Sequence, residues 1–204
     1  MVENKNYSND FGKKRNQIAR AAAELFIRKG FLKTTVREIA RNSGMSIGTL
    51  YHYASSKDDI LAMFQDVEID SLRDFFEDSS TSMLQMSPVE ALCHAIETYF
   101  TQVDIIQDII VFWYQETKNL PPTQRSKLLR NEELLTEVFK KIVKAGCDCG
   151  EFNVKDITLA ANNIIVLGDM WAFRRWLIGR NYTIKQYIEK QTAFVLYGLR
   201  HGRY

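Results

Sequence analysis

The sequence has little proline, glycine or cysteine and no long apolar run. Only 3 Pro and 10 Gly occur in 204 residues, which disfavours a many-stranded sandwich and favours long helices. One of the longest apolar stretches, residues 109–114, is far shorter than the ~18 residues that a membrane span needs. Residues 1–12 are polar and lack the apolar core of a signal peptide. We therefore expect a cytoplasmic protein without a membrane partner.

The cysteines and histidines do not form a recognisable site. The three cysteines are Cys93, Cys147 and Cys149. An odd number does not suit a disulfide framework, and the spacing of the last two does not suit zinc. The three histidines are scattered, and none has the i, i+4 spacing of a helical metal site. We expect free thiols, and no metal, cofactor or catalytic residue.

Charge is distributed unevenly along the chain, although the net charge is only +2. Residues 1–57 contain 11 Lys and Arg against 4 Asp and Glu, which gives +7. The remaining residues contain 16 basic and 21 acidic side chains, which gives −5. A small basic head on a larger acidic body favours a polyanion-binding end with a separate body. A solvated charged helix face is the alternative reading.

Helix signals follow one another closely in the basic segment. We expect residues 1–12 to form a disordered arm and a helix to run from residue 13 to Gly30, where glycine permits a left-handed end. Thr35 and Glu38 have capping-box spacing at the start of a second, short helix. Ser46 caps a third helix after a tight turn at residues 42–45, and Ser56 caps a fourth. Two short helices around a Gly-containing turn predict a helix-turn-helix over residues 13–60.

The rest of the chain, residues 61–204, is also predicted to be helical. The fourth helix should continue to about residue 76, and Ser87 with Pro88 and Glu90 begins another. Further helices are expected at 105–117, 123–145, 156–178 and 183–198, and the first of these is apolar nearly all round, so we expect it to be buried. The predicted fold is all-α with about nine helices: a helix-turn-helix head on a larger body for ligand binding and dimerisation.

The third predicted helix has the composition that a DNA groove requires. Its first residues are small or carry hydrogen-bonding groups: Ser46, Ile47, Gly48 and Thr49. A helix that enters the major groove is slim at that end and carries donors there. Tyr51, His52 and Tyr53 can reach phosphates from its other end. The alternatives are that Tyr51 is a core residue and His52 an ordinary exposed histidine.

Three segments, TTVREIA at 34–40, GMSIGTLYHY at 44–53 and SKDDIL at 56–61, resemble the TetR family of bacterial transcriptional repressors. The likeness covers roughly residues 17–64; Ala54 stands where members usually carry a bulky apolar residue. The resemblance implies contacts with double-stranded operator DNA, which fall here on Thr35, Arg37, Ile47, Gly48, Thr49, Tyr51, His52, Tyr53 and Lys57.

The resemblance also implies a homodimer through the last two helices and a small-molecule effector in the body. An acyl-CoA is one candidate effector, because some similar proteins sense such thioesters. The candidate lining residues are Tyr99, Phe100, Phe112, Trp113, Tyr114, Phe139, Trp171, Arg174 and Arg175. Plain core packing of the aromatic residues is the alternative. The two arginines can bind an anionic ligand or pair with Glu189 or Asp169.

Two other classes of function compete with this reading of the sequence. A helical enzyme lacks support, because the sequence has no Gly-rich phosphate loop, nucleophile motif or metal cluster. A protein–protein adaptor with a basic head is the stronger alternative to a ligand-responsive repressor. Duplex DNA binding that weakens steeply as salt rises separates the repressor from the adaptor.

Overall fold

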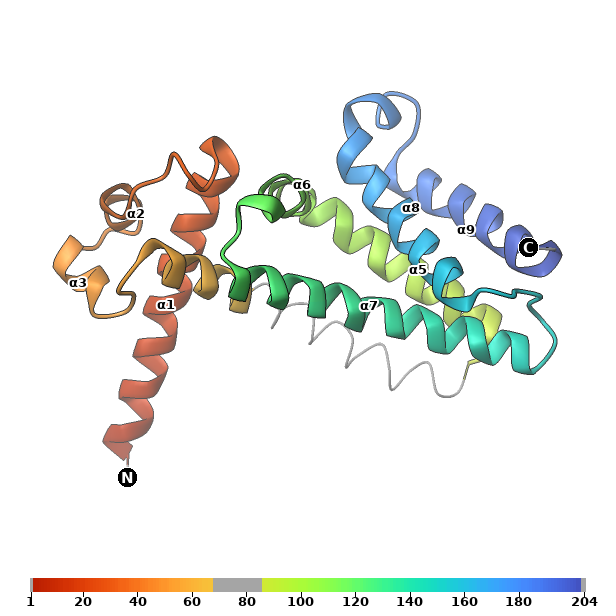
Figure 1. Ribbon diagram of the computed structural model, residues 1–204, viewed down its shortest axis with the longest axis horizontal. Coiled ribbons are helices and arrows are strands. Elements are labelled where there is room, and N and C mark those ends of the chain that lie inside the picture. Colours follow the sequence, from red (N-terminus) through yellow and green to blue (C-terminus); the bar gives the residue numbers. More distant parts are fainter. Residues whose placement is uncertain (1, 68–85, 203–204) are drawn as a thin grey trace. The chain divides into compact units, whose positions relative to one another are not determined.

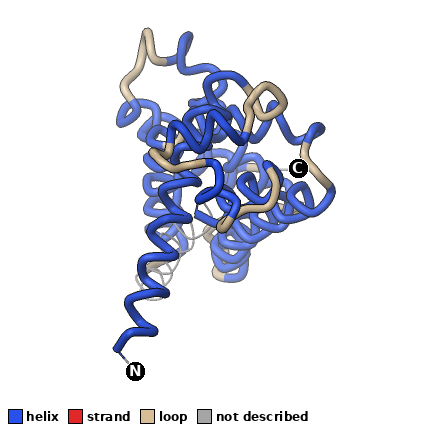
Figure 2. Tube along the Cα trace, turned by 90° about the vertical axis from the view of Figure 1, so that its left-hand side faces the viewer, coloured by secondary structure: helices blue, strands red, loops and turns tan. Residues whose placement is uncertain are grey.

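The computed structural model describes residues 2–67 and 86–202, with only the backbone for residues 2–10. Within those two ranges the regular structure is helical throughout, with no strand (Figures 1 and 2). The described residues contain nine α-helices and one 3-10 helix, which confirms the predicted fold class. They divide into two compact units, one with residues 2–67 and 112–128 and the other with residues 86–111 and 129–202.

The first unit contains the predicted helix-turn-helix. Its elements are α1 (Val2–Lys29), α2 (Val36–Asn42), α3 (Ile47–Tyr51) and a helix that begins at residue 57. Helix α1 begins at Val2, so residues 2–12 are helical rather than the disordered arm that we expected. These residues contain no proline, and Gly12 is the one glycine among them. The predicted continuation of the fourth helix to residue 76 lies outside the described residues.

Aromatic rings form the core of this unit. Phe26 of α1 stacks on Phe112 at 6.0 Å between ring centroids, and Phe64 stacks on Trp113 at 5.0 Å. Residues 112–116 end helix α6 (Gln107–Glu116), which is followed by the 3-10 helix η1 (Thr117–Asn119). The unit therefore takes in a segment that we had assigned to the body. The sequence pattern does not predict that residues 112–116 join this unit, because Phe26 and Phe112 are far apart in the chain.

The second unit is built around α5 (Pro88–Ile105), α8 (Ile157–Ile178) and α9 (Ile184–His201). Helix α7 (Pro122–Asp148) begins in the first unit and continues into this one from residue 129. Helix α8 packs against both α5 and α9 (Figure 1). A close approach is possible because Gly168 of α8 lies against the rings of Phe100 and Tyr99 of α5.

Two helices of the body end three residues later than the expected bounds, and one predicted feature was wrong. Helix α7 continues past Gly146 to Asp148, because the glycine is buried against the Phe152 ring instead of ending the helix. Helix α9 likewise continues beyond Gly198 to His201. The segment 105–117 is interrupted at Ile106, and its side chains are not buried all round, since Ile105 and Tyr114 are 71% and 72% exposed.

Several absences hold for the part of the chain that the structure describes. None of its helices combines the length and apolarity required to cross a membrane. In the same residues, no group of three or more His, Cys, Asp or Glu side chains is arranged to hold a metal ion. The three cysteines are free thiols, as the sequence predicted.

Candidate nucleic-acid interface and effector region

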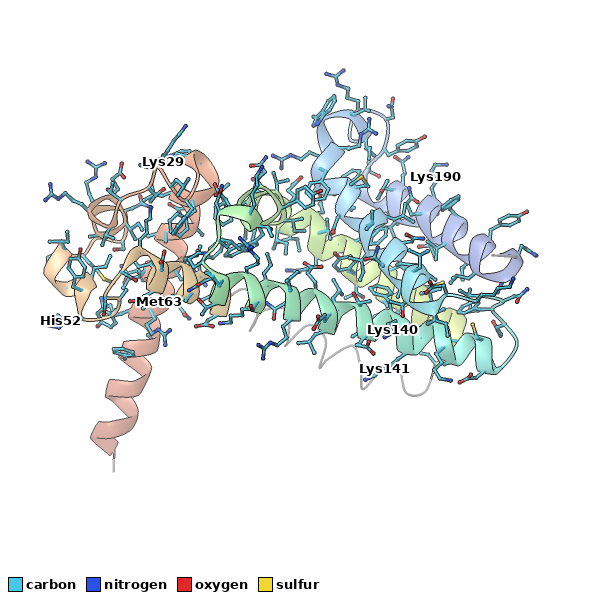
Figure 3. The ribbon with its side chains drawn as sticks, in the orientation of Figure 1. Lys29, His52, Met63, Lys140, Lys141 and Lys190 are labelled. Carbon is cyan, nitrogen blue, oxygen red and sulfur yellow. The ribbon has the colours of Figure 1, made fainter. Side chains whose placement is uncertain are left out.

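Helix α3 is held by its cap and turns most of its side chains to solvent. The hydroxyl of Ser46 accepts a hydrogen bond from the Thr49 amide at 3.0 Å and lies 2.8 Å from the Thr49 hydroxyl. Leu50 is fully buried and anchors the helix, whereas Ile47 and Tyr51 are 40% and 50% exposed. Gly48, Thr49 and His52 are exposed as well (His52 is labelled in Figure 3). Tyr51 is therefore not the core residue that the alternative reading proposed.

Tyr53 differs from its neighbours, because it is half-buried. Its ring lies 4.9 Å from the ring of Phe11 on α1. A half-buried tyrosine keeps its polar tip near solvent while its ring packs. Helix α1 therefore supports the end of the α3 segment through an aromatic contact that the sequence did not suggest.

The N-terminus of α2 carries the predicted capping box. Thr35 accepts from the Glu38 amide at 3.3 Å, and the Glu38 carboxylate accepts from the Thr35 amide at 2.9 Å. Lys29 donates to the same carboxylate at 2.5 Å. The Lys29 hydrogen bond first, and the Thr35 bonds next, lower the pKa of Glu38 to about 2. Arg37, one residue before Glu38, is exposed.

Lys57 lies at the start of the next helix and is fully engaged within the protein. Its ammonium donates to three backbone carbonyls, at 2.9 Å to Phe31, 3.3 Å to Leu32 and 3.0 Å to Thr34. It also lies 4.4 Å from the centroid of the Phe31 ring, as a cation–π contact. An ammonium has three N–H donors, so these bonds use all of them.

A hollow of about 410 Å³ opens between α1 and the end of α2. Its lining residues are Lys13, Asn16, Gln17, Arg20, Ala21, Glu24, Asn42 and Ser43. Gln17 donates to the Ser43 carbonyl at 2.7 Å, and Asn42 donates to the Ala21 carbonyl and to the Glu24 carboxylate, both at 3.0 Å. Asn42 and Ser43 belong to the predicted turn, but the other lining residues lie on α1, outside the three segments that resemble the family. The sequence analysis therefore missed the hollow.

Four of the predicted effector residues lie together in the second unit. Tyr99 is 6.0 Å from Phe100 and 5.9 Å from Phe139, measured between ring centroids. The Tyr187 ring lies between those of Phe100 and Trp171, with centroid distances of 6.1 Å and 5.2 Å. All of these rings are buried. The sequence analysis missed Tyr187, which has no motif of its own and is identified only by its contacts.

Carboxylates accompany these aromatic residues. The Tyr99 hydroxyl donates to Asp169 at 2.7 Å, and the Trp171 indole N–H donates to Asp104 at 2.6 Å. Burial raises the pKa of Asp169 to about 6, although the bond from Tyr99 opposes the rise. Desolvation, with the charge of Asp169, raises the pKa of Glu132 to about 7. The cluster therefore combines buried rings with the carboxyl group of Asp169, whose raised pKa favours its protonated form, whereas Glu132 is exposed.

The other predicted effector residues do not join this cluster. Trp113 packs in the first unit with Phe64 and with Phe112, and Tyr114 is exposed. Arg174 is exposed and has a non-helical backbone, with φ −123°. Arg175 pairs with Asp108 at 2.8 Å, which is neither of the two partners considered from the sequence. The structure thus brings together the buried aromatic residues but not the arginines.

Helices α8 and α9 carry large apolar side chains that their own unit leaves exposed. Leu159 and Val166 of α8 are exposed, and Phe194 and Tyr197 of α9 are 66% and 69% exposed. Residues three, four or seven apart lie on one face of a helix, so each pair occupies one stripe. In the same two helices, Ile164, Ile165, Trp171 and Val195 are buried within the unit.

Two family models match the chain. One is described as "Bacterial regulatory proteins, tetR family" and covers residues 18–63. The other, "Tetracyclin repressor-like, C-terminal domain", covers residues 85–177. The first range contains the helix-turn-helix, and the second runs from before α5 to the last turn of α8.

Individual proteins show the same likeness. The HTH-type transcriptional regulator HbdR of Aromatoleum sp. (strain CIB) is 30% identical over 181 residues, which are 87% of this chain and 76% of that protein. The HTH-type transcriptional repressor KstR2 of Rhodococcus jostii (strain RHA1) is 28% identical over 194 residues, or 91% of each chain. The crystal structure of FadR from Bacillus subtilis in complex with stearoyl-CoA has a TM-score of 0.70 and 22% identity, and covers 92% of this chain and 98% of that one.

Proposed function

This chain belongs to the TetR family of bacterial regulatory proteins and is a transcriptional regulator, and we propose that it is a repressor. In this proposal a homodimer binds palindromic operator DNA, and a small hydrophobic or acyl-CoA-like effector releases it. The observation that carries the proposal is the exposed surface of α3, because its capped, slim N-terminal end suits a major groove.

The DNA contacts that we propose are divided between bases and phosphates. Ile47, Gly48 and Thr49 lie on the exposed first turn of α3, where side chains of a recognition helix read base edges. Tyr51 and His52, at the other end, can donate to phosphate oxygens, and Arg37 extends the same surface from α2. Thr35 and Ser46 cap their helices, so they fix the two helix N-termini that face the DNA.

Dimerisation through α8 and α9 is the second part of the proposal. It is supported by the apolar stripes on both helices, since exposed contiguous apolar surface is typical of interfaces. A symmetric dimer presents two recognition helices to successive half-sites, which lie ~34–36 Å apart on DNA. That arrangement explains why such regulators bind palindromes.

The effector proposal is supported by the aromatic cluster around Tyr99 and by the relatives. The FadR structure contains stearoyl-CoA, which makes an acyl-CoA the candidate to test first. A ligand releases the DNA only if its affinity is higher for the protein conformation that does not bind DNA than for the one that does. In this proposal the acyl chain lies among the rings of Tyr99, Phe100 and Phe139.

Selection of duplexes from a random DNA pool, followed by binding titrations, tests the proposal. We expect a palindromic site for which the affinity falls steeply as salt rises. Thr49→Val removes a hydroxyl at nearly constant shape, and it should lower the discrimination between bases by about 1–3 kcal/mol. Titration with acyl-CoAs of different chain lengths should weaken the complex. A protein that selects no sequence, and instead binds an acidic protein partner, would support the adaptor alternative.

A further inference from the structure

The hollow on α1 and α2 lies beside the candidate DNA surface and was not part of the proposed function. It adjoins Ser43, at the start of the turn that leads through Gly44 to Ser46 and α3. We propose that this hollow is a phosphate site, and that it holds a backbone phosphate of the operator beyond the bases that α3 reads. This inference rests on the proposed function, because it assumes that α3 binds DNA.

The cations of the hollow share one face of α1. Lys13, Asn16 and Arg20 are spaced by three and four residues, so their side chains lie above one another along the helix. All three are exposed at the hollow. Lys13 supplies a compact positive charge, Arg20 can bind a phosphate through two N–H groups, and the Asn16 amide adds a donor.

The walls of the hollow are already fixed by internal hydrogen bonds. Gln17 holds the carbonyl of Ser43, and Asn42 holds the carbonyl of Ala21. Glu24 is the single acid of the lining, and Asn42 donates to its carboxylate. Two positive charges against one negative charge leave a net positive lining, which is complementary to a phosphate and unsuited to a cationic ligand.

The test is the salt dependence of operator binding by the 204-residue chain. Lys13→Gln with Arg20→Gln should weaken binding to specific and random duplexes alike, and should reduce the slope of log affinity against log salt by about 2. Lys140→Gln with Lys141→Gln removes the same charge from α7 in the second unit and should leave the slope unchanged (Figure 3). A wild-type slope in the α1 variant would overturn the proposal.

A substitution of opposite sign gives an independent check. Glu24→Gln removes the negative charge but keeps an oxygen that can accept from Asn42, so operator affinity should rise. Calorimetry with inorganic phosphate distinguishes a free anion from DNA. Loss of phosphate binding in the α1 variant without a change in operator affinity would contradict the DNA assignment. If the wild-type protein selects no operator, the proposed function fails. If the wild type selects an operator and the variants keep its affinity and salt slope, only the phosphate site fails.

Lys57 leads to a second inference, from different contacts. The family resemblance implied a DNA contact at this position, but its three N–H donors are bound to the carbonyls of residues 31, 32 and 34. We infer that Lys57 is a positioning residue, which holds the segment between α1 and α2 and thereby fixes Thr35 at the start of α2. Phe31, which lies under the ammonium, is further held through its amide by Glu116 at 3.3 Å.

Salt dependence separates the two roles of Lys57. Lys57→Met should lower operator affinity, measured well below the melting temperature, while the salt slope stays within about 0.3 of wild type. Arg37→Met, which removes an exposed cation of α2, should lower both affinity and slope. A slope reduced by about 1 for Lys57→Met would make it a phosphate contact. Unchanged affinity with reduced stability would make its role structural only. Lys57→Gln replaces the Met variant if circular dichroism shows loss of helix.

Discussion

Asp169 and Glu38 illustrate how the surroundings of one carboxyl group decide its proton affinity. Asp169 is desolvated among rings, so its pKa rises to about 6, whereas Glu38 accepts bonds from Lys29 and Thr35, so its pKa falls to about 2. The two shifts act on stability in opposite directions. The raised pKa of Asp169 could not be predicted from the sequence, because its partner Tyr99 is 70 residues away.

For Asp169→Asn we expect higher stability above pH 6 and a flatter pH profile. The unfolded carboxyl loses its proton near 3.8 and the folded one near 6, so between these values the folded state binds more protons and wild-type stability falls as pH rises. Asparagine has no such titration, yet its oxygen can accept from Tyr99. Thermal melts from pH 4 to 8 measure the change.

The control substitution for that experiment is Glu38→Gln. A lowered pKa stabilises the fold above 4.5 and the stabilisation is lost as pH falls toward 2. The Glu38 variant should therefore differ from wild type in its pH dependence below 4.5 and not between 4.5 and 6. Identical profiles for Asp169→Asn and wild type from pH 4 to 6 would contradict the raised pKa.

At the level of helices, several N-terminal caps were predictable and the contacts between helices were not. Caps at Thr35, Ser46 and Ser87 were identified from sequence, because a cap is a bond between neighbours in the chain. The close approach of α5 and α8 was not, because nothing in the sequence marks Gly168 as a packing glycine.

Gly168→Ala should destabilise the protein by about 1–3 kcal/mol, since overpacking forces neighbouring side chains to move. An added Cβ would lie 2.7 Å from the Phe100 ring and 2.8 Å from the Tyr99 ring. Chemical denaturation measures the loss. The matched control is Gly12→Ala, where nothing lies within 4 Å of the added Cβ and alanine should stabilise helix α1 by about 0.4–1 kcal/mol. Equal stability of the two variants would refute the close approach.

At the level of the whole molecule, function depends on assembly as well as on the head. Phe194 and Tyr197 are largely exposed on α9, so their replacement should affect the association of two chains more than the folding of one. Two linked heads bind a palindrome more tightly than one, because the second contact becomes intramolecular.

We therefore expect Phe194→Lys with Tyr197→Lys to be a folded monomer with much weaker operator binding. Burying lysine charges at an apolar interface is unfavourable, whereas each lysine is solvated in the single chain. Sedimentation velocity measures the oligomeric state and circular dichroism the helix content. Leu134→Lys, at an exposed apolar position of α7, should remain a dimer. A dimeric double variant would exclude this face of α9 as the interface.

The sequence by itself determined the all-helical class, the helix-turn-helix with its caps and the exposed residues of α3. These features depend on propensity, on helical periodicity and on bonds between residues three or four apart, all of which are local. Tertiary structure decided which residues meet across the chain. It placed Trp113 in the first unit with Phe64, paired Arg175 with Asp108 and engaged every donor of Lys57. Such contacts depend on packing between segments that are distant in sequence, and no local pattern specifies them.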